Sequence, residues 1–233
     1  MSTAPYFVSI PAGAFTMGDD AGRDDERPEH EVWVDDFEVG RYAVSNEDYA
    51  RFLDGTGYPE PGAWHDPCLN RPRQPVAAVS WFDCVAYCRW LTEQTGHVHR
   101  LPTEAEREKA ARGGIERARY PWGDAEPAQV GRFSLGKLAV NETVDVDDDP
   151  LVNGFGLYHM GDNLHEWCLD WYDAGYYSSS PESNPRGPAL GDARASRGGS
   201  WRHHVKTCRC AARSSIPPDR RFTDYGLSLI HIS

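Results

Sequence analysis

The segment Arg197–Arg213, with the sequence RGGSWRHHVKTCRCAAR, carries an unusual density of groups that bind metals or react. Two glycines and the small side chain of Ser200 allow a tight turn that brings main-chain N–H groups close to a surface. One tryptophan, two histidines and two cysteines follow within a dozen residues, so we expect any chemical centre to lie here. A structural interpretation stays open: a core Trp201, an exposed turn at His203 and His204, and a buried strand that holds Cys208 and Cys210.

The composition indicates a loop-rich α+β protein. The 233 residues are 39% hydrophobic and include eight Trp and eleven Tyr, enough to bury a sizeable core. Glycine (22 residues) and proline (17 residues) are frequent, and no apolar helical periodicity extends beyond about 15 residues. We expect a single domain over residues 1–233 with few helices.

The charge balance favours cations over nucleic acids as partners. The formal net charge is −12, and acidic residues cluster in Asp19–Glu31 and Asp145–Asp149. This balance argues against binding to nucleic acid or to an anionic membrane. The sequence contains no pattern of a secretory signal or membrane span. We therefore expect a cytoplasmic protein whose six cysteines are free thiols or ligands, with Cys84 and Cys88 packed in the core.

Cap residues predict three helices. They begin after Ser45, Ser80 and Thr103, each followed by an acidic residue three positions later, and end at Gly55 or Gly57, at Gly96 and at Gly113. Alternating apolar residues predict a hairpin of two short strands over Phe7–Met17 and one or two strands over Glu31–Val44, with a surface loop over Gly18–His30 between them.

The segment His159–Trp171, HMGDNLHEWCLDW, is a second concentration of polar groups. Asp162 and Glu166 suit a hard cation such as calcium together with main-chain carbonyls, because calcium takes several oxygen ligands and tolerates irregular geometry. An alternative is that Glu166 makes a buried hydrogen bond to nearby backbone, since a buried carboxylate needs a partner.

The order of short motifs resembles the formylglycine-generating enzyme, or sulfatase-modifying factor, family. The matching blocks are PAGAFTMG, ERPEHEV, YAVSNEDYARF, PVAAVSWFDCVAYCRWL, RLPTEAEREKAARGG, YPWG, NGFGLYHMGDNLHEW, SRGGSW and RCAARS. The resemblance covers about residues 7–226 and implies one compact, loop-rich α+β domain related to the C-type-lectin fold. Residues 227–233, LSLIHIS, depart from the family pattern.

The resemblance implies oxidation of a sulfatase cysteine to formylglycine by O₂, with copper held by two cysteines. Soft thiolates suit Cu(I), and a two-coordinate site leaves room for substrate and oxygen. The ungapped positions of that pair are His203 and Cys208, and the segment is about three residues shorter than in the enzyme. The thiolate pair is therefore absent. A His203/Cys208 pair, with His204 nearby, remains as a candidate site for copper, zinc or iron.

Further site residues are carried over from the same resemblance. The substrate groove is expected at Ser200, Trp201, His165 and Arg213, where His165 replaces a tryptophan. The structural calcium site is expected at Asp162, Leu164 and Glu166, with His159 in place of the usual Asn or Asp. The family disulfides of Cys88 and Cys210 have no partner, because Ala111 and Leu229 stand at the partner positions.

These observations leave three functional hypotheses. The first is a formylglycine-generating-enzyme-like protein that binds a peptide, protein or small-molecule ligand in a surface groove, without the sulfatase-activating reaction. The second is a divergent metal-dependent oxidoreductase that uses His203 and Cys208 on a thiol or sulfur compound with O₂. The third, an authentic sulfatase-activating enzyme, is disfavoured by the missing thiolate pair.

Overall fold

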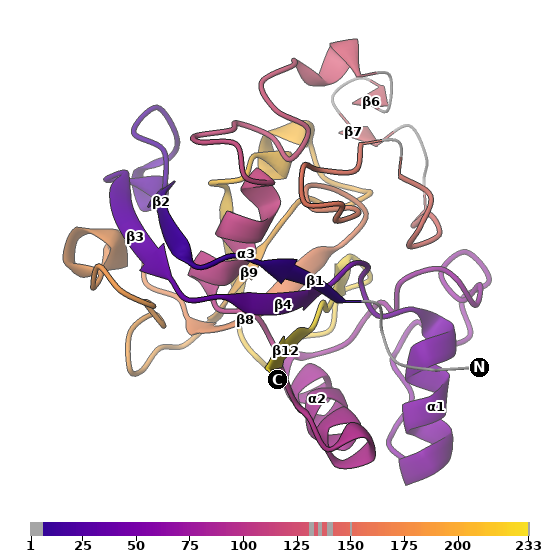
Figure 1. Cartoon of the computed structure of the whole chain (residues 1–233). Coiled ribbons are helices and arrows are strands. Elements are labelled where there is room, and N and C mark those ends of the chain that lie inside the picture. Colours follow the sequence, from indigo (N-terminus) through magenta and orange to yellow (C-terminus); the bar gives the residue numbers. More distant parts are fainter. Residues whose placement is uncertain (1–6, 131–132, 135–136, 139–141, 150, 233) are drawn as a thin grey trace.

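The computed structural model describes residues 7–130, 133–134, 137–138, 142–149 and 151–232 (Figure 1). Its helices are α1 (Asn46–Thr56), α2 (Trp81–Thr95) and α3 (Glu104–Arg112). Its strands are β1 (Phe7–Ile10), β2 (Gly13–Met17), β3 (His30–Val34), β4 (Phe37–Gly40), β5 (Val98–Arg100), β6 (Phe133–Ser134), β7 (Lys137–Leu138), β8 (His165–Trp171), β9 (Arg194–Arg197), β10 (Arg213–Ile216), β11 (Tyr225–Gly226) and β12 (Ile230–Ile232). Long loops and four short 3₁₀ turns connect them, which confirms a loop-rich α+β fold.

The three predicted helix starts are confirmed. The hydroxyl groups of Ser45, Ser80 and Thr103 each accept a hydrogen bond from the backbone N–H three residues later. At Ser80 and Thr103 the acidic side chain also accepts from the cap residue's own N–H, which completes a capping box. Each helix ends at a glycine with left-handed backbone, the conformation that favours glycine.

The predicted hairpin over Phe7–Met17 is wrong in its pairing. Strand β1 pairs with β4 and strand β2 pairs with β3, so the segment β1–β2 runs antiparallel to the segment β3–β4 (Figure 1). Between β1 and β2 lie Pro11, which has no backbone N–H, and Ala12. The intervening acidic loop is not wholly a surface loop, because Glu26 in its 3₁₀ turn is fully buried and bound to Arg209.

The C-terminal residues belong to the core despite their unusual sequence. Strand β12 lies between β4 and β5 in the order β1-β4-β12-β5. Leu227, Leu229 and Ile230 are all buried, the last two in different hydrophobic clusters. Residues 227–232 therefore belong to the fold although their sequence was expected to be atypical.

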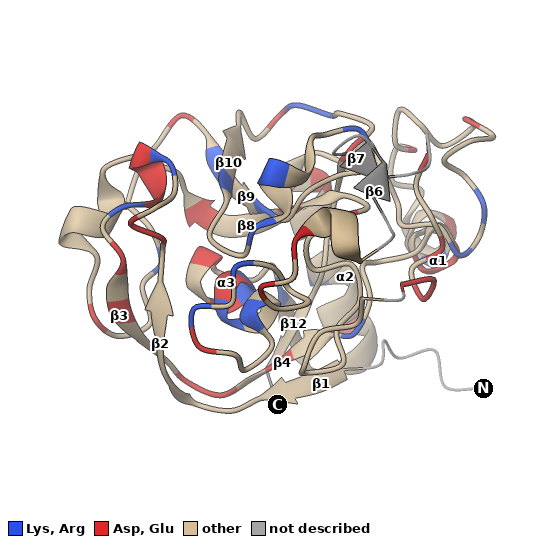
Figure 2. Cartoon of the chain, turned by 90° about the horizontal axis from the view of Figure 1, so that it is seen from above, with Lys and Arg blue, Asp and Glu red and all other residues tan. Residues whose placement is uncertain are grey.

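Helix α3 is buried although most of its residues are charged. Figure 2 shows residues of both signs on this helix, with basic residues on the neighbouring strands β9 and β10. The side chains of Glu104 and Glu108 contact Arg197, and Glu104 also binds Arg213. The centre of the fold is thus an ion-pair network between two apolar clusters.

None of the helices in the described part of the chain is long and apolar enough to cross a lipid bilayer.

Candidate functional site

The second sheet, in the order β10-β9-β8-β11, joins the two polar segments singled out in the sequence. Strand β11 runs parallel to the start of β8, with Tyr225 opposite His165. The backbone N–H of His165 donates to the carbonyl of Asp224 over 2.9 Å. Because β11 follows a long loop, this pairing places Asp224 beside a residue almost sixty positions earlier in the sequence.

The loop after β9 lies directly on the loop before β8. Gly199 donates to the carbonyl of Gly161 at 3.1 Å, and Trp201 donates to the carbonyl of Asn163 at 2.9 Å. A Cβ atom on Gly199 would stand 2.5 Å from the Gly161 oxygen and 2.7 Å from the Cys208 sulfur, so only glycine allows this approach. The loop then turns through a hydrogen bond from His203 N–H to the Ser200 carbonyl, 3.2 Å long.

This arrangement brings His165, His203 and Asp224 together in what we call the His–His–Asp cluster. The Nε2 atom of His165 lies 2.7 Å from Nδ1 of His203, and Nε2 of His203 lies 3.4 Å from Oδ2 of Asp224. The Ser200 hydroxyl donates to the same carboxylate oxygen at 3.4 Å. His165 and Asp224 are buried, whereas 44% of the His203 side chain is exposed.

Burial is the main cause of an altered pKa at His165. Desolvation, followed by the charge of His203, lowers the pKa of this imidazole to about 4 against the opposing charge of Asp224. His165 is therefore neutral at physiological pH. A neutral imidazole keeps a lone pair with which to accept a proton or bind a metal.

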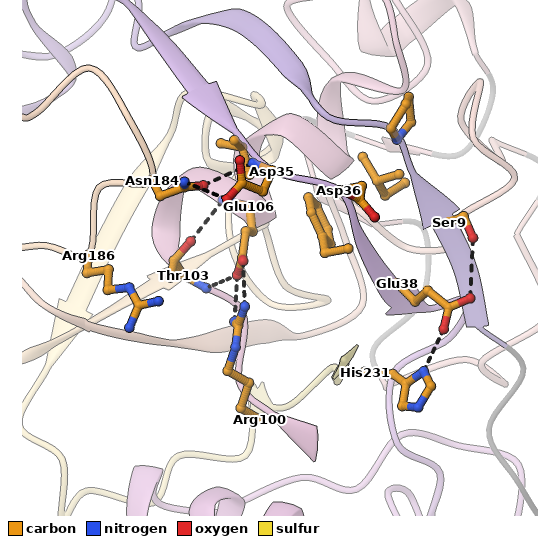
Figure 3. A pocket seen from close by; sticks show the side chains of 14 residues that line it. Ser9, Asp35, Asp36, Glu38, Arg100, Thr103, Glu106, Asn184, Arg186 and His231 are labelled. Atoms are coloured by element: carbon orange, nitrogen blue, oxygen red, sulfur yellow. Dashed lines mark hydrogen bonds and ion pairs between the residues drawn. The ribbon is translucent and has the colours of Figure 1, made fainter. Parts of the chain in front are cut away.

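Two pockets in the described part of the chain have linings that do not include this cluster. One, of about 730 Å³, borders the loop after β9 at Lys206 and Thr207, and six of its fifteen lining residues are basic. The other, of about 470 Å³, is shown in Figure 3. Its polar groups largely bind one another, as in the Arg100–Glu106 ion pair and the hydrogen bond from Asn184 to Asp35.

A family model described as the sulfatase-modifying factor enzyme 1-like domain matches residues 1–231 of the chain. The chain belongs to this family. It is 36% identical to the formylglycine-generating enzyme of Thermomonospora curvata, over 93% of this chain and 90% of that enzyme. It is also 31% identical to the inactive C-alpha-formylglycine-generating enzyme 2 of Mus musculus, over 84% of this chain and 74% of that protein.

Solved structures support the same fold. PvdO from Pseudomonas aeruginosa superposes with a TM-score of 0.83 at 27% identity, covering 98% of this chain and 95% of that one. Treponema denticola variable protein 1 superposes with a TM-score of 0.84 at 23% identity, covering 97% and 94% of the two chains, and so shares the fold. The fold is therefore that of the sulfatase-modifying factor family, as the sequence motifs predict.

The two members of the predicted His203/Cys208 pair have different environments. Cys208 is buried and packs with Tyr120 and Val205, away from solvent. Among the described residues, the groups of three or more metal-binding side chains contain His203 but no cysteine. All six cysteines are free thiols. The side-chain partners of His203 are His165 and Asp224.

The predicted groove residues have different environments. Trp201 is half-buried, and its indole N–H donates to the Thr223 carbonyl at 3.4 Å. Ser200 is buried against Asp224. Arg213 is buried too, and its guanidinium donates twice to the Glu104 carboxylate, at 2.7 and 2.9 Å. Its contacts therefore give Arg213 a structural role in the core, where the resemblance implies a substrate contact.

The predicted calcium ligands do not fit a calcium ion. The Glu166 carboxylate accepts a hydrogen bond from Nε of Arg107 at 2.7 Å, and both side chains are buried. A calcium ion on Glu166 would place a second cation against the arginine that already neutralises it. The Asp162 carboxylate lies 2.8 Å from Nδ1 of His159, so it too has a basic partner. Leu164 offers only its backbone carbonyl.

Two residues of the site escape recognition from the sequence. Asp224 carries no local signal, because only the pairing of β11 with β8 brings it to His165. Arg107 lies in a segment correctly predicted as a helix, but an arginine on a charged helix indicates a solvent-exposed face. Its Nη2 atom also donates to the Met160 carbonyl at 3.1 Å.

Proposed function

We propose that this chain is a formylglycine-generating-enzyme-like protein that lacks the copper-thiolate centre and binds a peptide, protein or small-molecule ligand without activating sulfatases. The observation that carries the proposal is the pairing of His203. At the position where the family resemblance implies the first copper thiolate, an imidazole contacts His165 and Asp224.

The chemistry of copper explains why this change matters. Two soft thiolates stabilise Cu(I) in a two-coordinate site, whereas imidazole and carboxylate prefer divalent ions with more ligands. Cys208 offers one thiol, and that thiol is buried in a cluster with Tyr120 and Val205. The inactive relative in Mus musculus gives a precedent for this fold without the sulfatase-activating reaction.

The surface next to the cluster supports the ligand-binding half of the proposal. Trp201 is half-buried beside an exposed His203, and the loop that follows borders the basic pocket. A pocket of about 730 Å³ lies within the size range that small-molecule sites occupy. Trp201 supplies the kind of large aromatic contact that anchors peptide and protein ligands.

The test is an assay with a sulfatase-derived peptide that contains the target cysteine. The chain is incubated with peptide, copper and O₂, and the product is analysed by mass spectrometry, with the Thermomonospora curvata enzyme as positive control. We expect no conversion by this chain under conditions in which the control converts its peptide. Turnover of the peptide by this chain would refute the proposal.

Binding is measured separately with the same peptide carrying a fluorescent label. We expect Trp201→Ala to weaken binding in an anisotropy titration by about tenfold or more, as for a central aromatic contact. Trp33→Ala serves as the matched control, because Trp33 is 46% exposed and lies on strand β3. Equal effects of the two substitutions would argue against a ligand surface at Trp201.

A further inference from the structure

We infer that His165, His203 and Asp224 form a binding site for a divalent transition metal ion, with two imidazole nitrogens and one carboxylate as ligands. The inference rests on the proposed function, because it names the chemical class of one ligand of the same surface. It differs from the copper-thiolate site in ligand atoms, in charge and in the ions that it prefers.

The convergence of donor atoms is the first argument. One potential ligand atom from each of the three side chains lies within 4.8 Å of the other two. Ligands of one ion at about 2.0–2.2 Å from the metal stand roughly 3 Å apart. The 2.7 Å between the two imidazole nitrogens is slightly shorter than this, so His203 has to move outward by less than about 1 Å.

Two of the three ligands are held rigidly, and the third can move. His165 lies on strand β8 and is buried, and Asp224 is fixed by the adjoining strand β11. His203 lies in a loop with almost half of its side chain in solvent, so it can adjust. Solvent also reaches the outer side of the cluster, where water or another ligand would complete the coordination shell.

Neighbouring groups form hydrogen bonds with the three proposed metal ligands. The hydroxyl of Ser200 donates to the Asp224 carboxylate, and the backbone N–H of His165 donates to the Asp224 carbonyl. Partners of this kind orient ligands and hold their geometry. Arg202 opposes binding, since its Nη1 lies 3.7 Å from the other Asp224 oxygen and donates to the Thr223 hydroxyl at 3.2 Å. Its side chain is 48% exposed, so a bound ion would displace this guanidinium towards solvent.

The ligand set also indicates which ions to test. Two histidines and one carboxylate with open positions suit Fe(II) and Zn(II), whereas oxygen-only sites suit calcium and magnesium. The second cluster of possible ligands, Asp149, His159 and Asp162, is less suitable. It offers one imidazole and two carboxylates, and Nε2 of His159 lies 3.1 Å from the Asp145 carbonyl, which is outside that cluster.

The experiment uses the full chain after chelation and dialysis. Co(II), a spectroscopic substitute for Zn(II) and Fe(II), is titrated while visible absorption is followed, and Zn(II) is titrated by calorimetry. We expect one ion per chain and a Co(II) spectrum typical of mixed nitrogen and oxygen ligands. Calcium is the control ion, and it should give no heat at this site.

Three variants identify the ligands. His203→Ala and Asp224→Asn should each lower Zn(II) affinity by at least about tenfold, with unchanged circular dichroism. His204→Ala is the matched control, because His204 is the exposed neighbour of His203 and its ring accepts a hydrogen bond from Lys206 N–H. Its affinity should equal that of the unmodified chain.

Two results would overturn the inference: wild-type binding no tighter than that of His203→Ala, or equal losses in His203→Ala and His204→Ala. Either would assign the cluster to hydrogen bonding alone. These outcomes are independent of peptide conversion, so a failed metal titration leaves the proposed function standing, and peptide conversion leaves the metal titration interpretable.

Discussion

The buried pair of Arg107 and Glu166 gives a sharp prediction, because it stands where the family resemblance implies calcium. Replacing Arg107 by Met keeps an unbranched apolar stem but leaves the Glu166 carboxylate buried without its cation. Both side chains are almost completely buried, at 1% and 3% exposure. Breaking a buried ion pair from one side costs about 3–5 kcal/mol.

The assay is urea unfolding followed by circular dichroism, with and without calcium. With a denaturant slope of about 2–3 kcal/mol/M, the loss corresponds to a shift of the midpoint of roughly 1–2.5 M. The matched control is Arg89→Met, which breaks the surface pair Arg89–Glu93. Its side chains are 82% and 60% exposed, so the expected cost is about 0.5 kcal/mol or less.

A double variant separates the charge from the packing. Arg107→Met combined with Glu166→Gln removes both charges and should recover part of the lost stability, because no unpaired carboxylate remains. Equal shifts for Arg107→Met and Arg89→Met would refute the argument. So would a wild-type midpoint that rises with calcium, since it would show that Glu166 binds the ion despite its arginine.

Three further predictions concern stability. Burial, followed by the charge of a neighbouring carboxylate, raises the pKa of Asp170 to about 8, so stability should fall as pH rises from about 4 to 8, and Asp170→Asn should flatten that slope in urea unfolding. Thr103→Ala removes the cap of α3 and should cost about 1–2 kcal/mol; a midpoint unchanged from wild type would contradict this. Leu229→Ala should cost about 2–5 kcal/mol if the C-terminal segment is core, whereas Leu190→Ala, at a side chain 83% exposed, should change almost nothing.

Local signals in the sequence predict helix α3 but not its burial. Thr103 and Gly113 mark its ends, because capping depends on residues that are close in sequence. Its interior is mostly charged, which ordinarily indicates a solvated face. The partners that make burial tolerable lie far away in the sequence, as Arg197 and Arg213 do for Glu104. No periodicity within the helix encodes them.

The candidate site shows the same limit. His165 and His203 are recognisable as unusual residues, and the sequence even places both near one surface through family resemblance. Their actual partnership needs the contact of the loop after β9 with the loop before β8, and Asp224 needs the β8–β11 pairing. The family resemblance instead implies Cys208 as the partner of His203, and the structure buries that thiol with Tyr120 and Val205.

Two adjacent residues on β8, His165 and Glu166, have separate roles. His165 and Glu166 are successive in a strand, so their side chains point to opposite faces. Glu166 contacts Arg107 on one face of the strand, and His165 contacts the half-exposed His203 on the other. Loss of the buried ion pair therefore lowers stability without removing a ligand from the cluster, whereas loss of His203 removes a ligand without opening the core.

The unfolding midpoint and the Co(II) affinity of two variants test this separation. Glu166→Gln should lower the unfolding midpoint and leave the Co(II) affinity unchanged, whereas His203→Ala should lower the Co(II) affinity and leave the midpoint unchanged. If Glu166→Gln abolished Co(II) binding in the folded chain, the cluster would depend on the core ion pair for its geometry.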